Sequence, residues 1–434
     1  MRDRARVPPV RLVFAAAAGC ALLLAALAAR AQTEPPVVAP AAPPGPSYDV
    51  RFEIRIVPTE KAAHVAIHLS DPARAVDWLR FRVDPERQIA FRGDGQIRVA
   101  EPESASGEEV TWTPPRGGGV LRYLARIDHL RDESSYDARA TRDWALLRAE
   151  DLVPQVRASF QDGAQSRARL QLVLPQGWSA VVPYAPLPDG TWAVERPELK
   201  FDRPSGWLLM GRLGVARERI AGAHVAIGAP VGQKMRRQDI LALLRWTLPA
   251  LRKVVALPER ITIVGAGDPM WRGGLSGPGS AYLHADLPLI SEDATSPVLH
   301  EVVHVLLRAR SGERGDGLVE GIAELYSLEA LVRSKTISRR RFERALARIA
   351  AKGRGVGSIA VDDANGAVAS RAVVVLRELD AELRRVTGGQ KSLDDVVRAL
   401  AERPQAISLA HFRSVTERVA GQTLPAFFDR AELK

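Results

Sequence analysis

The segment at residues 298–309, VLHEVVHVLLRA, constrains the fold of this chain most, because it is apolar at most positions yet carries two histidines and a glutamate. A run that is apolar on nearly every side is typical of a buried helix, where a polar side chain is costly unless it has a partner. On a helix, His300 and His304 project from one face, one turn apart. Both imidazoles can therefore reach one metal ion, which gives the polar residues a reason to be buried.

Glu301 belongs to the same pattern, H-E-x-x-H, but has a different predicted role. Its side chain lies about 100° around the helix from His300, where the carboxylate reaches a water on the metal rather than the metal itself. The pattern predicts zinc, with Glu301 as the general base that activates water. The alternative is an ordinary helix with a charged face.

A third zinc ligand is expected from residues 315–327, GDGLVEGIAELYS, which predict a second helix starting near Asp316. Glu320 and Glu324 lie four residues apart on one face of that helix. Glu320 is the predicted third ligand, which leaves the fourth position to water. Glu324, one turn on, is predicted to accept a hydrogen bond from a ligand imidazole and so to hold its orientation. A solvated acidic face is the alternative for both residues.

The start of the chain is predicted to lie outside the folded domains. Residues 1–31 combine a basic start, an apolar run and the small-x-small sequence ARA, which together predict a signal peptide cleaved before Gln32. The mature protein is therefore expected to be exported, periplasmic or secreted, without stable membrane insertion. An uncleaved anchor helix and lipidation at Cys20 are the alternatives. Residues 32–46, rich in proline and alanine, predict an extended linker.

Composition limits the kinds of partner and of metal site. The formal net charge is +10, but arginines and lysines are interspersed with acids rather than gathered in stripes. No nucleic-acid partner is expected, since no binding module is recognisable and the chain is predicted to be exported. Cys20 is the single cysteine and lies in the predicted leader. Disulfides are therefore not expected, and any metal ligand must be His, Asp or Glu.

The hydrophobic pattern changes twice along the chain, which predicts a multidomain α+β protein. Residues 47–218 alternate apolar and polar residues in short runs separated by turn residues, as expected of an antiparallel β domain. Residues 219–333 mix strand and helix patterns, and residues 334–434 are almost entirely helical in pattern. In these two regions the strands are predicted at 223–230, 260–267 and 279–290, and the helices at 236–255, 296–310, 317–332, 337–351, 367–386, 392–402 and 408–420.

His64 and His68 also lie four residues apart, but in a segment whose pattern predicts a strand. Residues four apart in a strand share a face but are separated by about 13 Å. One metal ion cannot span that distance. We therefore predict that these two histidines form no metal site.

Longer stretches of the sequence, beyond H-E-x-x-H itself, resemble the motifs of a known group of zinc peptidases. HEVVH followed by GLVEGIAELY resembles the gluzincin pattern, H-E-x-x-H followed by W-L-x-E-G-x-A/T-x-Y. Residues 270–280 (MWRGGLSGPGS), 376–400 and 415–433 resemble motifs of one branch, the glycyl-aminopeptidase family, whose members usually carry a PDZ domain. The resemblance implies a β domain, a thermolysin-like zinc-peptidase domain at 219–333 and a helical domain at 334–434. It also implies a peptide or protein substrate.

The chain departs from this family in ways that bear on the substrate. A PDZ domain is not expected, since the chain ends at Lys434. The family's E-H after G-G-L is replaced by Ser276 and Gly277. In aminopeptidases of this broad class, a glutamate near this place binds the free amine of the substrate. Its replacement leaves exopeptidase and endopeptidase action both open.

A further departure concerns the tyrosine that stabilises the oxyanion in this family. The corresponding stretch, residues 368–380, reads VASRAVVVLRELD, and no tyrosine follows Tyr326. Tyr282 and His284, in the strand after GGL, are the nearest substitutes by sequence. Their spacing places them on one face of that strand. Ordinary strand residues are the alternative for both.

Together these features predict zinc-dependent peptide hydrolysis in which water is activated by zinc and Glu301. The alternative is a zinc-binding pseudoenzyme, catalytically weak or inactive, that acts as a periplasmic binding or scaffold protein. The missing tyrosine and the missing amine-binding glutamate favour the alternative. The retained Glu301 favours hydrolysis, because zinc binding alone does not require a base.

Overall fold

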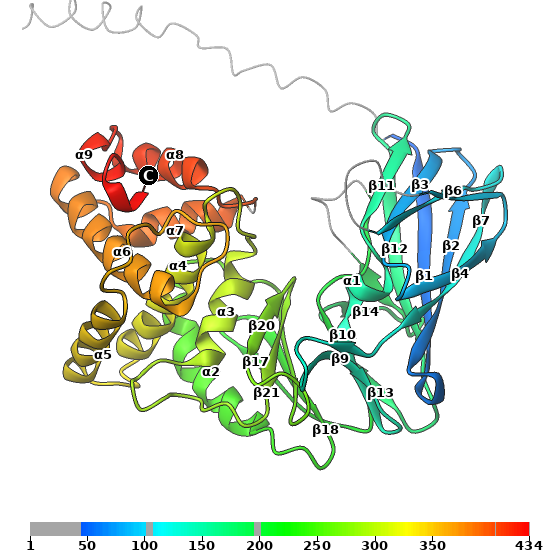
Figure 1. Ribbon diagram of the computed structural model, residues 1–434, viewed down its shortest axis with the longest axis horizontal. Helices are drawn as coiled ribbons and strands as arrows, with labels where there is room; N and C mark the ends of the chain where they lie inside the picture. Colours follow the sequence, from blue (N-terminus) through cyan, green and yellow to red (C-terminus); the bar gives the residue numbers. More distant parts are fainter. Residues whose placement is uncertain (1–44, 101–106, 195–200, 404, 434) are drawn as a thin grey trace, which may run out of the picture. The chain divides into compact units, whose positions relative to one another are not determined.

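The computed structural model describes residues 45–100, 107–194, 201–403 and 405–433 (Figure 1). The predicted signal peptide, residues 1–31, and all but the end of the predicted linker lie outside the described residues. Within the described part of the chain, no helix combines the length and the apolar character needed to cross a membrane.

Strands dominate the chain up to Gly211, as the period-two pattern predicts. Along Ser47–Val57, buried residues alternate with exposed or half-buried ones, so that one face of this strand packs into a core. The elements of this region are β1 (Ser47–Val57), β2 (Ala62–Asp71), β3 (Val76–Val83), β4 (Gln88–Gly93), β5 (Gln96–Ala100), β6 (Glu108–Thr113), β7 (Gly117–Arg126), β8 (His129–Leu130), β9 (Tyr136–Ala140), β10 (Trp144–Arg148), α1 (Ala149–Leu152), β11 (Val156–Phe160), β12 (Gln165–Val173), β13 (Ser179–Val181), β14 (Ala185–Pro186), β15 (Trp192–Val194) and β16 (Trp207–Gly211). They form sheets with the orders β14-β15-β12-β1-β2-β7-β4, β13-β16-β10-β9-β8 and β11-β3-β6-β5.

One pairing in this region differs from the predicted antiparallel arrangement. β1 is antiparallel to β2 but parallel to β12, with Ser47 opposite Gln165. Parallel neighbours need a long connection, and the elements from β2 to β11 provide it. The alternation of buried and exposed residues is the same in both kinds of pair, so the sequence pattern does not distinguish them.

His64 and His68 lie on β2, which confirms the predicted strand. His64 Nε2 is 3.0 Å from Glu60 Oε2, and His68 Nε2 is 3.5 Å from Glu53 Oε2. Neither histidine belongs to a group of potential metal ligands among the residues that the structure describes.

A further sheet carries the part of the fold that positions the candidate site. Its strands, in spatial order, are β17 (Leu213–Ile220), β18 (Ala223–Pro230), β19 (Arg260–Ala266), β21 (Ser280–His284) and β20 (Gly274–Gly277). β18, β19 and β21 run parallel, and the edge strand β20 is antiparallel to β21. Helix α2 (Arg237–Leu251) connects β18 to β19, as a parallel pair requires. The strand predicted at 279–290 is shorter than expected, because it ends at His284.

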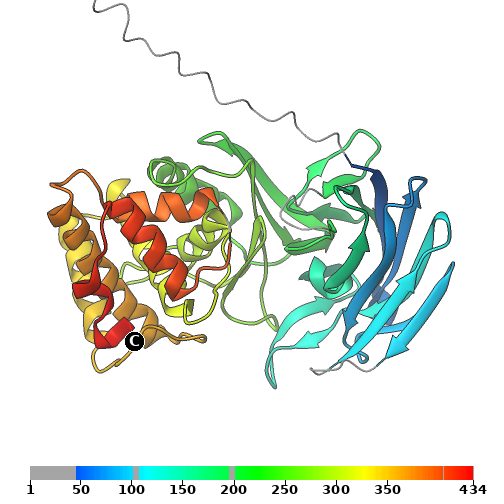
Figure 2. The ribbon, with the colours of Figure 1, turned by 90° about the horizontal axis from the view of Figure 1, so that it is seen from above.

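Helices account for most of the remaining described chain. They are α3 (Pro297–Leu307), α4 (Asp316–Arg333), α5 (Arg339–Lys352), α6 (Gly366–Val386), α7 (Leu393–Glu402), α8 (Leu409–Ala420) and α9 (Pro425–Phe428). The predictions for α3 to α8 are confirmed to within three residues at either end. Figures 1 and 2 show these helices, coloured from yellow-green to red, gathered beside the green sheet. Residues such as Ile227 and Leu283 of the sheet share one buried core with Val302, Ile322 and Leu376 of the helices.

The opposite face of the same sheet is also buried. Tyr282 shares a cluster there with Leu146 of β10 and Trp207 of β16. Ala281 and Leu283, the neighbours of Tyr282, join the core with the helices instead, because successive residues of a strand point to opposite faces. A side chain of β21 therefore reaches the helices only at alternate positions.

Candidate metal centre

Three side chains from two helices converge. His300 and His304 of α3 have their Nε2 atoms 3.1 Å apart. Glu320 of α4 places Oε2 3.2 Å from His300 Nε2 and Oε1 3.3 Å from His304 Nε2. Ligand atoms offered by the three residues all lie within 4.8 Å of one another. The structure thus brings together the three predicted zinc ligands.

Local sequence explains where α3 begins and which face it buries. Ser296 caps the helix, because its Oγ accepts a hydrogen bond from the backbone N of Leu299 at 3.2 Å, and Pro297 occupies the first turn. Apolar residues such as Val302 are buried in the core. The side chains of His300 and His304 keep 20% and 10% of their surface exposed. The two histidines therefore lie at the border of the core, where a substrate can reach them.

Helix α4 presents Glu320 and Glu324 to α3, one turn apart. Its position is set by a close approach to α6, since a Cβ on Gly321 would lie 2.5 Å from the Cβ of Ala372. Glu324 Oε2 lies 3.3 Å from His300 Nδ1, the nitrogen that is not directed at Glu320. A hydrogen bond from Nδ1–H to this carboxylate leaves Nε2 as the ligand atom and holds the ring in place.

Electrostatics at the cluster favour a cation. Burial lowers the pKa of His300, but hydrogen bonds with Glu320 and Glu324 outweigh this effect and raise the pKa to about 10. Burial raises the pKa of Glu320, but its hydrogen bonds with His300 and His304 outweigh burial and hold that pKa well below its usual range. Two imidazoles and one carboxylate are also the donor set of many catalytic zinc sites. The residues therefore fit a zinc ion in both charge and ligand type.

Glu301 lies beside the cluster, against the edge strand β20. The residue is buried, and burial raises the pKa of its carboxyl group, while the nearby His300 and His304 lower it. The carboxyl group also has a hydrogen bond with the backbone of Ser276. A Cβ on Gly274 would lie 2.7 Å from Glu301 Oε1, so β20 passes directly over the carboxyl group. Glu301 is thus held between the ligand helix and the sheet edge.

Tyr282 and His284 are placed elsewhere. They share one face of β21, as their spacing predicts, but it is the face opposite the helices. The Tyr282 hydroxyl donates to Trp271 O at 2.7 Å. His284 Nδ1 accepts from the backbone N of Asp286 at 3.2 Å, and its Nε2 lies 3.4 Å from Asp268 Oδ1. The structure therefore does not bring these two side chains to the metal-ligand cluster.

The segment that lacks the expected tyrosine, residues 368–380, lies within α6. The Ser370 hydroxyl donates to Gly366 O at 2.7 Å, and Val368 packs close to Gly317 of α4. The last tyrosine of the chain, Tyr326, donates its hydroxyl to Asp394 Oδ1 at 2.8 Å. Residues 368–380 contain no tyrosine, and the phenol of Tyr326 is already hydrogen-bonded to Asp394.

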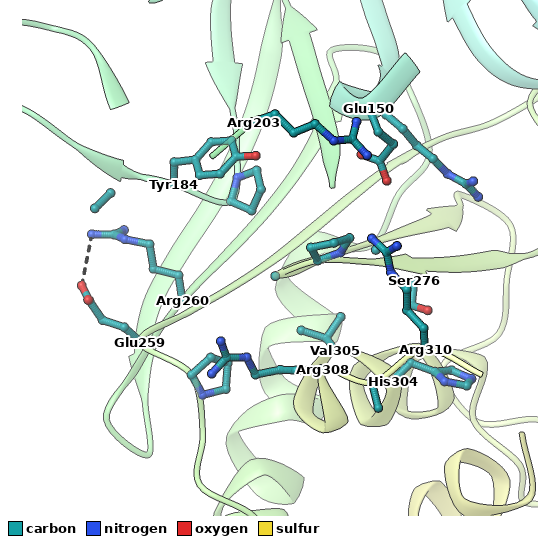
Figure 3. A pocket seen from close by; sticks show the side chains of 18 of the residues that line it. Glu150, Tyr184, Arg203, Glu259, Arg260, Ser276, His304, Val305, Arg308 and Arg310 are labelled. Carbon is teal, nitrogen blue, oxygen red and sulfur yellow. Dashed lines mark ion pairs between the residues drawn. The ribbon is translucent and has the colours of Figure 1, made fainter. Parts of the chain in front are cut away.

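A pocket of about 840 Å³ adjoins the cluster, with His304 and Ser276 in its wall (Figure 3). Sequence reasoning missed it, because its charged lining comes from separate segments that no local pattern connects. The arginines of this lining are Arg148, Arg203, Arg260, Arg308 and Arg310.

Comparison with known proteins extends these observations. No protein-family model matches the chain, and no curated protein matches its sequence. Solved structures do match. The aminopeptidase N family protein of Idiomarina loihiensis has a TM-score of 0.62 at 13% identity, covering 81% of this chain and 70% of that one.

The M1 zinc metallopeptidase of Deinococcus radiodurans is similar as well. It has a TM-score of 0.56 at 14% identity, covering 90% of this chain and 94% of that one. A variant of it bound to a Tyr-Ser-Ala substrate has a TM-score of 0.57 at 15% identity, covering 89% and 94%. This chain, with its sheet-rich first part and its helical last part, therefore has the fold of M1 zinc metallopeptidases.

Proposed function

We propose that this protein is a zinc-dependent peptide hydrolase. The observation that carries the proposal is the convergence of His300, His304 and Glu320, with Glu301 between this cluster and the sheet edge. The similarity in fold to M1 zinc metallopeptidases supports it.

In the proposed reaction, the three ligand residues hold zinc and Glu324 keeps His300 in orientation. Zinc at this position supplies Lewis-acid polarisation of the scissile carbonyl and lowers the pKa of water to about 7. Glu301 takes a proton from the attacking water and delivers it to the leaving amine as the C–N bond breaks. Its raised pKa suits this role, because a more basic carboxylate accepts the proton more readily.

The edge strand β20 is the proposed support for the substrate backbone. It ends the sheet and pairs only with β21 in the described chain. A peptide can add to such an edge through main-chain hydrogen bonds. Because Gly274 brings β20 over Glu301, a peptide paired along this strand would have its backbone next to the base.

The finer assignments rest on the sequence motifs. We propose that residues 219–333 form a thermolysin-like catalytic domain between a β domain at 47–218 and a helical domain at 334–434. The proposed relationship to glycyl-aminopeptidases is supported by GGL, whose second glycine begins β20, and by the two motifs near the end of the chain. We also propose export to the periplasm or the medium, on the pattern of residues 1–31.

A zinc-binding pseudoenzyme is the second candidate, favoured by the position of Tyr282 and His284 on the far face of β21. Loss of one oxyanion donor typically costs about 10²–10³ in turnover, which slows hydrolysis without abolishing it. The retained carboxylate of Glu301 against β20 is better explained by catalysis, since a buried carboxyl group with no role is costly.

Changing Glu301 to glutamine separates the two candidates. The substitution keeps the size of the side chain but removes the base, so zinc content should stay equal to wild type while turnover of mixed peptides falls by at least about 10²-fold. The matched control is Glu343→Gln, an exposed position on α5. Chelator-sensitive cleavage in wild type that is equal in the Glu301 variant would show that this motif does not catalyse. Absence of chelator-sensitive cleavage in wild type would favour the pseudoenzyme.

A further inference from the structure

The pocket beside the metal-ligand cluster is rich in arginine. His304 and Ser276 connect it to the centre, and Figure 3 shows Arg203, Arg308 and Arg310 around the same space. Its charged lining consists of five arginines (Arg148, Arg203, Arg260, Arg308 and Arg310) and two glutamates (Glu150 and Glu259). The excess of arginine makes the pocket cationic.

The two glutamates offset only part of this charge, because five arginines and two glutamates leave an excess of three arginines. Glu150 Oε2 accepts a hydrogen bond from the backbone N of Gly206 at 2.6 Å, which uses part of its acceptor capacity. Glu259 is 73% exposed on its side chain, and its ion pair with Arg260 is 3.6 Å long. Water screens such an exposed pair, so the Arg260 guanidinium still attracts an anion.

Two donor atoms of this lining have no hydrogen-bond partner. Arg148 Nε and Arg260 Nε are buried without a hydrogen bond among the described residues. Trp207 does not line the pocket, but its indole Nε1 is also buried and unpaired, and it would lie 3.6 Å from a Cβ on Gly277, which does line it. A buried donor without an acceptor is costly and calls for an explanation. Arg148 and Arg260 line the pocket, so an acceptor oxygen of a ligand would meet their guanidinium groups on the side that faces the pocket, not at these buried atoms.

Arg308 and Arg310 lie just beyond the C-terminus of α3, both exposed and without an ion pair in the part of the chain that the structure describes. Cations near a helix C-terminus are favourable to the helix itself, which accounts for these two arginines without a ligand. It does not account for Arg148 and Arg260, which come from β10 and β19 and line the same pocket.

We propose that this pocket binds a carboxylate of the substrate, so that the protein prefers peptides with an anionic group near the scissile bond. The inference deepens the proposed hydrolase function and rests on it. Guanidinium groups bind carboxylates with paired, charge-assisted hydrogen bonds. With Ser276 in place of an acid, the same pocket repels the free amine that an aminopeptidase would bind. The carboxylate is either an acidic side chain or the C-terminus of a short peptide.

Matched peptides distinguish these sources. In one series, each peptide has an amidated C-terminus and carries Glu, Gln or Lys at one of the two residues that flank the scissile bond. A second series compares a free with an amidated C-terminus on an otherwise neutral peptide. At least one carboxylate should raise kcat/KM by about tenfold over its neutral partner, the factor given by 1.4 kcal/mol. Equal rates for Glu, Gln and Lys, together with equal rates for acid and amide, would overturn the proposal.

Variants connect the preference to the pocket. Arg308→Gln combined with Arg310→Gln should reduce the ratio of kcat/KM for the carboxylate peptide to kcat/KM for its neutral partner. Arg260→Gln should act in the same direction, which covers the case that the double variant does not fold. Arg344→Gln, an exposed position on α5, is the matched control and should leave the preference unchanged. A preference that survives both pocket variants would place the carboxylate site elsewhere and overturn the assignment.

A binding measurement separates this inference from the hydrolase proposal. Fluorescence anisotropy with the Glu301→Gln variant and labelled acidic or neutral peptides measures recognition without turnover. Selective binding of acidic peptides supports the pocket even where wild type cleaves nothing, in which case only the hydrolase proposal fails. Cleavage of peptides without any carboxylate preference in rate or binding leaves hydrolysis standing and overturns the inference.

Discussion

Glu324 is expected to control how tightly the centre holds zinc, although it is not a ligand. Its Oε2 lies 3.3 Å from His300 Nδ1, a long hydrogen bond, and 20% of its side-chain surface is exposed. A hydrogen bond to a charged group is worth about 1.5–3 kcal/mol, and the length and exposure place this one at the lower end. Glu324→Ala should therefore weaken zinc binding about tenfold, the factor given by 1.4 kcal/mol. This lies in the range of about 10–100-fold found for such orienting partners.

Competition with a chromophoric chelator measures this change as a zinc Kd. Glu324→Gln keeps a neutral acceptor at the same place, so its zinc Kd should fall between those of wild type and Glu324→Ala. Glu329→Ala is the control on the same helix, because Glu329 pairs with Arg333 and Arg377 rather than with the cluster. A zinc Kd for Glu324→Ala within twofold of wild type would refute the reasoning, since His300 would then need no orienting carboxylate.

Three further results are expected. His304→Ala should abolish stoichiometric zinc because it removes one of three ligands, and a full zinc atom per chain by elemental analysis of that variant would disprove the ligand assignment. N-acetylated peptides should be cut at rates comparable to free ones, because Ser276 is not acidic; a hundredfold preference for free amines, about 2.7 kcal/mol, would point to another carboxylate such as Glu150 of the pocket. N-terminal sequencing of the exported protein should find Gln32 first, and an intact Met1 would contradict the signal peptide.

The helices and the spacing of the ligands follow from local sequence. His300 and His304 share a face of α3 because residues four apart on any helix do so, and the apolar residues around them bury the rest of that helix. The same rule places Glu320 and Glu324 together on α4. A helix of ordinary length needs only its own residues and its cap to be recognised, which is why these predictions agree with the structure.

Local sequence does not predict which face of the sheet a strand residue occupies. Period two shows that Tyr282 and His284 share a face, but two cores lie on the two sides of this sheet. All five residues of β21 are buried, so the alternation of buried and exposed positions that usually marks the core-facing side of a strand is missing here. Only the packing of β10 and β16 against the sheet decides that Tyr282 points away from the metal-ligand cluster.

The arginine pocket depends on tertiary structure alone. Arg148, Arg203, Arg260 and Arg308 belong to segments far apart in the chain, and each looks like an ordinary surface cation in its own segment. Their convergence beside His304 results from contacts between strands and helices that are remote in sequence. Local patterns arise from interactions within a few residues, so they contain no information about which distant cations will share a cavity.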